Sequence, residues 1–127
     1  MILAVDFDGT IHTGNWPNIG EPRPNSIESL RQLKKDGHFI IIWTCREGKP
    51  QTDMVNWLLK NNIPFDQVNE HKPGITELYG YPARKVYAHL YIDDKQIGGL
   101  PHWNDIYNYI KSQEETYSDK VIREGHL

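Results

Sequence analysis

Acidic side chains follow two separate apolar stretches of this chain. Asp6 and Asp8 follow the first stretch, and Asp93 and Asp94 follow the last one. Carboxylates that lie close together repel one another strongly unless a cation neutralises them. Mg²⁺ prefers oxygen ligands and binds through one or two carboxylates together with water and phosphate oxygens. If folding brings the four aspartates together, their residue type predicts a magnesium site.

Such a site has the parts needed to hydrolyse a phosphate ester. A carboxylate beside a metal ion can attack phosphorus, because the ion screens the phosphate charge. A second acid two residues further on can protonate the leaving oxygen and later deprotonate water. Thr44 offers a hydroxyl and Cys45 a backbone N–H to hold phosphoryl oxygens, and a lysine would complete this set. No histidine is placed to activate the thiol of Cys45, so we assign it no role as a nucleophile.

The apolar stretches alternate with helical patterns, which is typical of α/β proteins with a parallel sheet. Short β-branched runs predict strands, and apolar residues spaced three and four apart predict helices between them. We expect strands over 2–7, 38–44, 65–70 and 86–92, and helices over 26–36, 51–61, 75–79 and 104–117. These elements predict a Rossmann-like three-layer sandwich with a central, mainly parallel sheet and no cap domain. Residues 1–127 form one predicted domain, whose charged tail is expected to fray from about residue 118.

Ligands of such sheets bind beyond the carboxyl ends of the strands. The aspartates and Thr44 all come at predicted strand ends, so we expect them to gather at one edge of the sheet. Two residues are candidates for the phosphate-binding lysine. Lys72 follows the third strand at that edge, and we favour it slightly. Lys85 precedes the fourth strand, so a straight strand from Val86 would place it at the opposite edge, whereas an irregular entry would bring it back.

The segment Asp6-Phe7-Asp8-Gly9-Thr10 resembles the first motif, DxDGT, of the haloacid dehalogenase (HAD) superfamily. Thr44 after an apolar strand resembles the second motif, and Asp93-Asp94 resembles the fourth, so the likeness spans about residues 1–100. The resemblance implies a Mg²⁺-dependent phosphatase in which Asp6 forms an aspartyl-phosphate and Asp8 is the general acid/base. It also implies that Asp6, Asp93 and the backbone carbonyl of Asp8 bind Mg²⁺, with Asp94 in support. An acid at position 8 resembles the phosphatases and phosphomutases of the superfamily, and a mutase would usually carry a sizeable cap domain.

No cap module fits between these motifs, so the loop from Ile11 to Arg23 is the only candidate lid. A site without a cap favours macromolecular substrates. Small phosphorylated substrates would fit if a second subunit covered the site, so the sequence is also compatible with a homo-oligomer. Trp16 in the loop is either an anchor or a platform for the leaving group. Arg46 either selects substrate or is an ordinary exposed charge, and His12 and His71 are further candidates for substrate contact.

Composition narrows the class of protein. Hydrophobic residues make up 38% and charged residues 24%, which is typical of neither disordered nor membrane chains. The net charge of -3 and the absence of a Lys/Arg run do not indicate nucleic acid as a partner, although a local basic patch is compatible with it. A single cysteine, an apolar strand that starts at Ile2 and the lack of any bilayer-length apolar run favour a cytoplasmic protein without a signal peptide or membrane partner.

Other functions remain open beside the phosphatase. A non-catalytic module would use the same site only to bind phosphate and metal. A polynucleotide-end phosphatase would be a narrower form of the enzyme. In the simplest alternative the aspartates only form turns, since Asp-Gly is a common turn pair.

Overall fold

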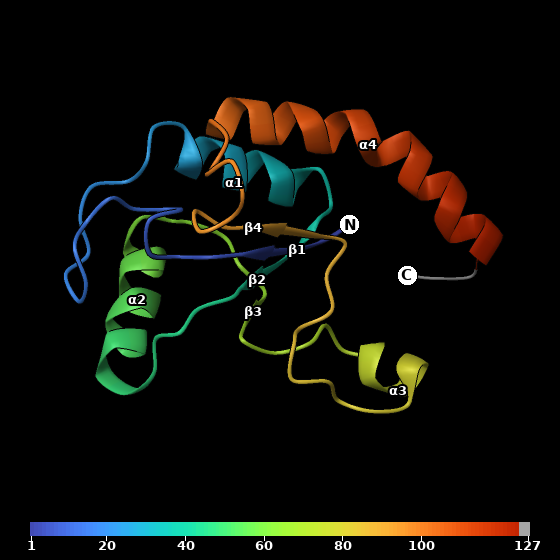
Figure 1. Cartoon of the computed structure of the whole chain (residues 1–127), viewed down its shortest axis with the longest axis horizontal. Coiled ribbons are helices and arrows are strands. Elements are labelled where there is room, and N and C mark those ends of the chain that lie inside the picture. The colour runs from blue at the N-terminus through green and yellow to red at the C-terminus, as the bar shows by residue number, and fades with distance from the viewer. Residues whose placement is uncertain (125–127) are drawn as a thin grey trace.

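The computed structural model describes residues 1–124, with side chains as far as Glu114, and its strands and helices alternate along the chain (Figure 1). The strands are β1 (Ile2–Val5), β2 (Phe39–Ile42), β3 (Gln67–Val68) and β4 (Leu90–Ile92). The helices are α1 (Ser26–Lys35), α2 (Gly48–Lys60), α3 (Ile75–Tyr79) and α4 (Trp103–Glu124). In this part of the chain no helix combines the length and the apolar character needed to cross a bilayer.

The four strands form one parallel sheet in the order β3-β2-β1-β4. Val5 at the end of β1 pairs with Ile42 of β2 and with Ile92 of β4, so these three strands end level with one another. Parallel neighbours need crossover connections, which α1, α2 and α3 supply in turn. The arrangement confirms the predicted α/β fold of the Rossmann-like three-layer type.

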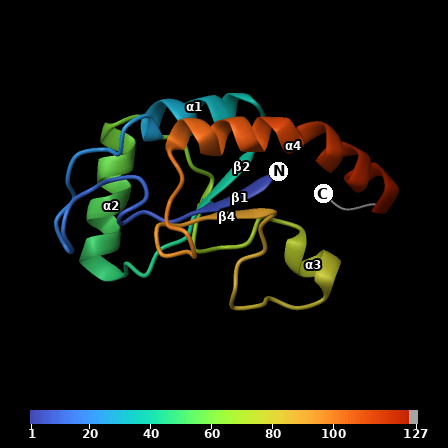
Figure 2. The same ribbon diagram turned by 45° about the horizontal axis from the view of Figure 1, so that its top comes forward.

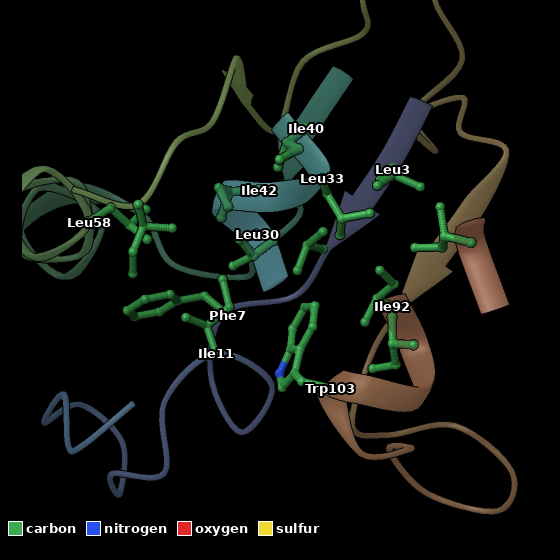
Figure 3. Close-up of a cluster of buried hydrophobic side chains, with 14 of the residues drawn as sticks. Leu3, Phe7, Ile11, Leu30, Leu33, Ile40, Ile42, Leu58, Ile92 and Trp103 are labelled. Atoms are coloured by element: carbon green, nitrogen blue, oxygen red, sulfur yellow. The ribbon is translucent and has the colours of Figure 1, made fainter. Parts of the chain in front are cut away.

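One face of the sheet carries the larger part of the core. Leu3 of β1 and Ile40 and Ile42 of β2 are fully buried there against Leu30 and Leu33 of α1 (Figure 3). The same cluster includes side chains of α2 and of the first turns of α4. Burying one such side chain stabilises a fold by about 1.5–3 kcal/mol. This face therefore anchors the strands whose ends carry the candidate site.

The opposite face has a thinner cover. Ile2, Ala4 and Ile41 pack there under Ile75 of α3 and under Val86. Figure 2 shows α3 on the far side of the sheet from α1 and α4. Residues on this face alternate with those of the main core, as the period of two in a strand requires.

The structure moves several predicted boundaries. The fourth strand begins at Leu90 rather than Val86, because β1 begins at Ile2 and offers no partner to the chain before His89, whose N–H donates to the Ile2 carbonyl at 2.8 Å. The third strand contracts to Gln67–Val68, and α2 begins at Gly48 instead of residue 51. The last helix continues to Glu124, past residue 118 where fraying was expected.

Candidate functional site

Three of the predicted aspartates meet at the carboxyl edge of the sheet. Asp6 follows β1, and its N–H donates to the carbonyl of Ile92 at 2.9 Å, which holds the ends of β1 and β4 together. Asp93 and Asp94 follow β4 directly. One carboxylate oxygen from each of the three lies within 4.8 Å of the others. The expectation that these strand ends converge is therefore confirmed.

Thr10 ties the two strand ends to each other. Its hydroxyl donates to Asp6 Oδ2 at 3.0 Å and accepts the backbone N–H of Asp94 at 2.9 Å. The Thr10 carbonyl accepts the indole N–H of buried Trp103 at 2.9 Å, which attaches the backbone at Thr10 to the core. Sequence reasoning placed Thr10 in the motif without giving it this role.

Gly9 is required at its position for two reasons. Its φ of +79° lies in the left-handed region, which side chains other than glycine rarely adopt. A Cβ at this position would also clash with the carboxylate of Asp94. The close approach of the Gly9 backbone thus sets where the Asp94 side chain lies.

The electrostatics of the three carboxylates favour a cation. Burial, a hydrogen bond with Asp94 and the negative charge of Asp93 raise the pKa of Asp6 to about 8. Without a cation, a proton therefore relieves the repulsion at neutral pH. The three donor groups are all carboxylates, the ligand type that Mg²⁺ prefers. Asp6, Asp93 and Asp94 thus fit a hard divalent cation.

Asp8 faces a different environment, two residues along the same turn. Arg46 donates two hydrogen bonds to its carboxylate, from Nε to Oδ2 at 2.8 Å and from Nη2 to Oδ1 at 2.7 Å. His12 Nε2 lies 2.8 Å from Oδ1. Burial acts to raise the pKa of Asp8, but the bonds from Arg46 and His12 outweigh burial and lower that pKa. Asp8 is therefore ionised at neutral pH.

The hydrogen bonds of His12 identify the position of its proton. Its Nδ1 accepts the backbone N–H groups of Gly14 at 2.9 Å and Gly20 at 3.1 Å. An imidazole nitrogen that accepts hydrogen bonds carries no proton, so the proton lies on Nε2 and is donated to Asp8. His12 thus supports Asp8, and because it is fully buried it offers no surface to a ligand.

Arg46 is buried, with 1% of its surface exposed. Besides Asp8, its guanidinium donates to the carbonyls of Pro17 and Pro50, each at 3.1 Å, and lies 4.8 Å from the centre of the Trp16 ring. Of the two interpretations of Arg46 that the sequence allowed, an ordinary exposed charge is therefore wrong. Sequence reasoning missed its pairing with Asp8, because the two residues are 38 positions apart and nothing local marks them as partners.

Thr44 and Cys45 follow β2 at the same edge of the sheet. Asn69, the residue after β3, accepts the Thr44 N–H and donates to the Thr44 carbonyl, both at 2.8 Å. The Thr44 hydroxyl accepts the backbone N–H of Arg46 at 3.0 Å, which leaves its own proton available to donate. Cys45 is exposed. The Thr44 hydroxyl and the Cys45 backbone are thus the donors at this strand end, whereas the Thr44 N–H is engaged.

Neither candidate lysine pairs with an aspartate of the site in the described part of the chain. Lys72 Nζ lies 5.6 Å from the ring centre of Phe39, the first residue of β2, toward the opposite edge of the sheet. Lys85 Nζ lies 4.6 Å from the ring centre of Tyr91 in β4. The chain before β4 is irregular, as the alternative for Lys85 required, so the choice of lysine stays a prediction.

His71 has contacts of a structural kind. Its Nδ1 accepts the N–H of Tyr87 at 3.2 Å, and its Nε2 lies 2.6 Å from the carbonyl of Ala83. The imidazole therefore clips the irregular segment before β4 to the chain that follows β3.

A parallel α/β sheet with clustered carboxylates at its carboxyl edge defines a Rossmann-like protein with a candidate cation site. The chain belongs to the family of a conserved protein from Bacteroides thetaiotaomicron, whose solved structure is 38% identical over 90% of this chain and 92% of that one, with a TM-score of 0.80. A solved protein from Vibrio cholerae is 29% identical over 53% of this chain and 66% of that one, with a TM-score of 0.42. No protein-family model and no curated protein matches the sequence.

Proposed function

We propose that this chain is a Mg²⁺-dependent phosphatase of the HAD type, which hydrolyses a phosphate monoester through an aspartyl-phosphate on Asp6. The observation that carries the proposal is the convergence of Asp6, Asp93 and Asp94, with one oxygen from each within 4.8 Å of the others. Mg²⁺ held by these three side chains would offset part of the negative charge of the carboxylates and of the phosphate. The DxDGT segment and the donors after β2 lie at the same edge, as phosphoryl transfer needs.

Asp6 is suited to attack phosphorus. Thr10 binds Oδ2 of its carboxylate at 3.0 Å, which fixes the side chain and leaves Oδ1 as the attacking atom. A bond forms between Oδ1 and phosphorus while the bond from phosphorus to the leaving oxygen breaks. The Thr44 hydroxyl and the Cys45 backbone N–H would donate to the remaining phosphoryl oxygens, where charge collects in the transition state. One of Lys72 and Lys85 would add a positive charge, which requires a movement that brings its amine from its present contact to the carboxyl edge of the sheet.

Asp8 is suited to the second step of the reaction. An ionised carboxylate accepts a proton from the water that attacks the aspartyl-phosphate, which releases inorganic phosphate and restores Asp6. In the first step Arg46 and His12 oppose protonation of Asp8, so donation to the leaving oxygen is the harder task. Leaving groups that depart as stable anions, such as phenolates, should therefore react faster than alkoxides.

The test is hydrolysis of a generic aryl phosphate with and without Mg²⁺. We expect Mg²⁺-dependent release of phosphate by the wild type and a loss of at least about a thousandfold in Asp6→Asn, because the amide is no nucleophile. Asp53→Asn is the matched control, since Asp53 is an exposed carboxylate on α2 that pairs with Lys49. Full turnover by Asp6→Asn would exclude the covalent mechanism.

A second function is favoured by one observation, the ion pairs that hold Asp8 away from proton donation. A module that binds phosphate and cation without turnover would show Mg²⁺ binding that depends on Asp6 and Asp93, with no hydrolysis of any phosphate ester. A preference for oligonucleotide 3′-phosphates over sugar phosphates would instead identify a polynucleotide-end phosphatase.

A further inference from the structure

Trp16 is exposed over 61% of its surface and is nevertheless held in place. The guanidinium carbon of Arg46 lies 4.8 Å from the centre of its ring, a distance at which a cation and an indole attract each other. Single exposed apolar residues are ordinary on protein surfaces. This one differs because its support is a buried arginine that also binds a residue of the candidate site.

Arg46 cannot easily release the indole. Its guanidinium donates to both oxygens of Asp8 and to the carbonyls of Pro17 and Pro50. Planar guanidinium groups with several bonds keep a fixed orientation. The indole therefore rests on a fixed support, while much of its surface remains open to solvent.

The loop that carries Trp16 is pinned at several points as well. Its two sides are joined by the N–H of Thr13 to the carbonyl of Glu21 at 2.9 Å and by the N–H of Arg23 to that of Ile11 at 2.7 Å. Gly14 and Gly20 approach so closely that a Cβ on either would clash with the other's backbone. An aromatic surface held this firmly can bind a flat ligand with little ordering cost.

Trp16 and Asp8 share the same guanidinium, which sets where the indole lies relative to the reaction. Under the proposed function, the oxygen that leaves the phosphate departs beside Asp8. Because one guanidinium contacts both Asp8 and the indole, the body of the leaving group would then come near Trp16.

We propose that Trp16, held by Arg46 beside Asp8, is the platform on which a planar aromatic leaving group of the substrate stacks. This inference rests on the proposed function and names its substrate class, a phosphate ester of an aryl or nucleoside alcohol. Stacking on an aromatic side chain depends little on which ring is bound, since every base or aryl ring has a π-face. A benzyl group and a nucleobase are the two sources of this chemistry.

The experiment compares pairs of substrates whose leaving oxygens are matched. Benzyl phosphate is compared with cyclohexylmethyl phosphate, and a nucleoside 5′-monophosphate with ribose 5-phosphate, using the full chain with Mg²⁺. We expect the wild type to prefer the planar member by about tenfold in kcat/KM, mostly through KM, which corresponds to about 1.4 kcal/mol. In Trp16→Ala the preference should fall below about twofold, and Trp16→Phe should keep most of it.

Tyr81→Ala is the matched control, because Tyr81 is an aromatic residue with 67% exposure that lies beside α3. It should leave both preferences unchanged. A drop in the nucleotide ratio upon Trp16→Ala would identify the nucleobase as the stacked group, and a drop in the benzyl ratio alone would identify an aryl ring attached near the phosphate. Equal losses for all four substrates, or no planar preference in the wild type, would overturn the proposal and leave Trp16 as a loop anchor.

Binding of two non-hydrolysable phosphonates separates this inference from the phosphatase itself. Benzylphosphonate and cyclohexylmethylphosphonate are titrated into the Mg²⁺-loaded wild type and Trp16→Ala, with the indole N–H signals followed by NMR. A planar preference that depends on Trp16, without turnover of any ester, would keep the platform and exclude the phosphatase. Turnover without a planar preference that depends on Trp16 would keep the phosphatase and exclude the platform. If neither turnover nor that preference is found, both proposals are overturned.

Discussion

Two carboxylates on one turn, those of Asp6 and Asp8, have their pKa values shifted in opposite directions by their neighbours. Asp6 faces two other aspartates, and its pKa rises to about 8. Asp8 faces Arg46 and His12, and its pKa falls below the ordinary value. Environments that separate the pKa values of nearby acids are typical of sites where the two acids have different tasks. Here the separation fits a nucleophile that needs a cation and a base that does not.

The pairing of Asp8 with Arg46 should contribute to stability as well as to function. Arg46→Gln leaves a half-buried carboxylate without its bidentate partner and removes the support of Pro17. We expect the free energy of unfolding at pH 7 to fall by about 2–4 kcal/mol, measured by urea denaturation. Lys49→Gln breaks an exposed ion pair with Asp53 and should cost less than about 0.5 kcal/mol.

The pH dependence of this loss has a defined sign. Because the pKa of Asp8 is lowered in the folded state, the stability from its ionised form is present above the unfolded value, about 3.9. That stability disappears as pH falls through the lower, folded pKa. The difference between wild type and Arg46→Gln should therefore shrink as the pH is lowered from 7 toward and below 4. A difference that stays constant over this range would show that Arg46 acts through packing alone.

At the scale of elements, the turn after β1 sets the geometry of the carboxylate cluster. Gly9→Ala places a Cβ against the Asp94 carboxylate at a φ of +79°. We expect a loss of about 2 kcal/mol or more in stability together with weaker Mg²⁺ binding, measured by thermal unfolding and by calorimetric titration. The change should weaken Mg²⁺ binding because it displaces the carboxylate of Asp94, one of the three proposed ligands.

Gly37→Ala separates backbone strain from that displacement. Gly37 follows α1 with a φ of +95°, and a Cβ there would meet no atom within 4 Å. It should therefore lower stability by about 1 kcal/mol without changing the affinity for Mg²⁺. If both variants weaken Mg²⁺ binding equally, the contact between Gly9 and Asp94 has no special part in forming the site.

At the scale of the whole molecule, the sequence allowed the prediction of those features that depend on strand order along the chain. Asp6 and Asp93-Asp94 follow apolar runs, and parallel strands bring their carboxyl ends to one edge. The predicted start of β4 was wrong because the first residue of this strand depends on where its neighbour β1 begins. An apolar run such as 86–92 reads as a strand whether or not a partner lies beside it.

The Asp8–Arg46–His12 network depends on tertiary structure and could not be found in the same way. Arg46 follows an exposed residue, Cys45, and it is buried by contacts with Asp8, with Pro50 and with the loop that holds Trp16. The choice between Lys72 and Lys85 could not be made from the sequence for a similar reason. The course of an irregular segment, rather than a pattern in the sequence, decides where Lys85 lies.

The carboxylate cluster should also make the stability of the whole fold depend on pH and on cations. The folded pKa of Asp6 is raised to about 8, whereas the unfolded value is about 3.9. Between these values the folded state holds a proton that the unfolded state does not, so the contribution of Asp6 to stability falls as pH rises and levels off above pH 8. In the absence of a cation, Asp6→Asn should therefore exceed the wild type in stability at pH 8 by about 1–3 kcal/mol, and by less at pH 5.

Mg²⁺ should reverse this order. A cation that binds only the folded state adds stability in proportion to the logarithm of its concentration over its Kd. The wild type, which keeps all three carboxylates, should gain more than Asp6→Asn when thermal unfolding is repeated at pH 8 with millimolar Mg²⁺. The three carboxylates follow β1 and its neighbour β4, the edge strand of the sheet, so a ligand bound by all three resists separation of the two strands. Equal gains for both proteins would mean that the cation binds elsewhere, and the site at the strand ends would then need a different occupant.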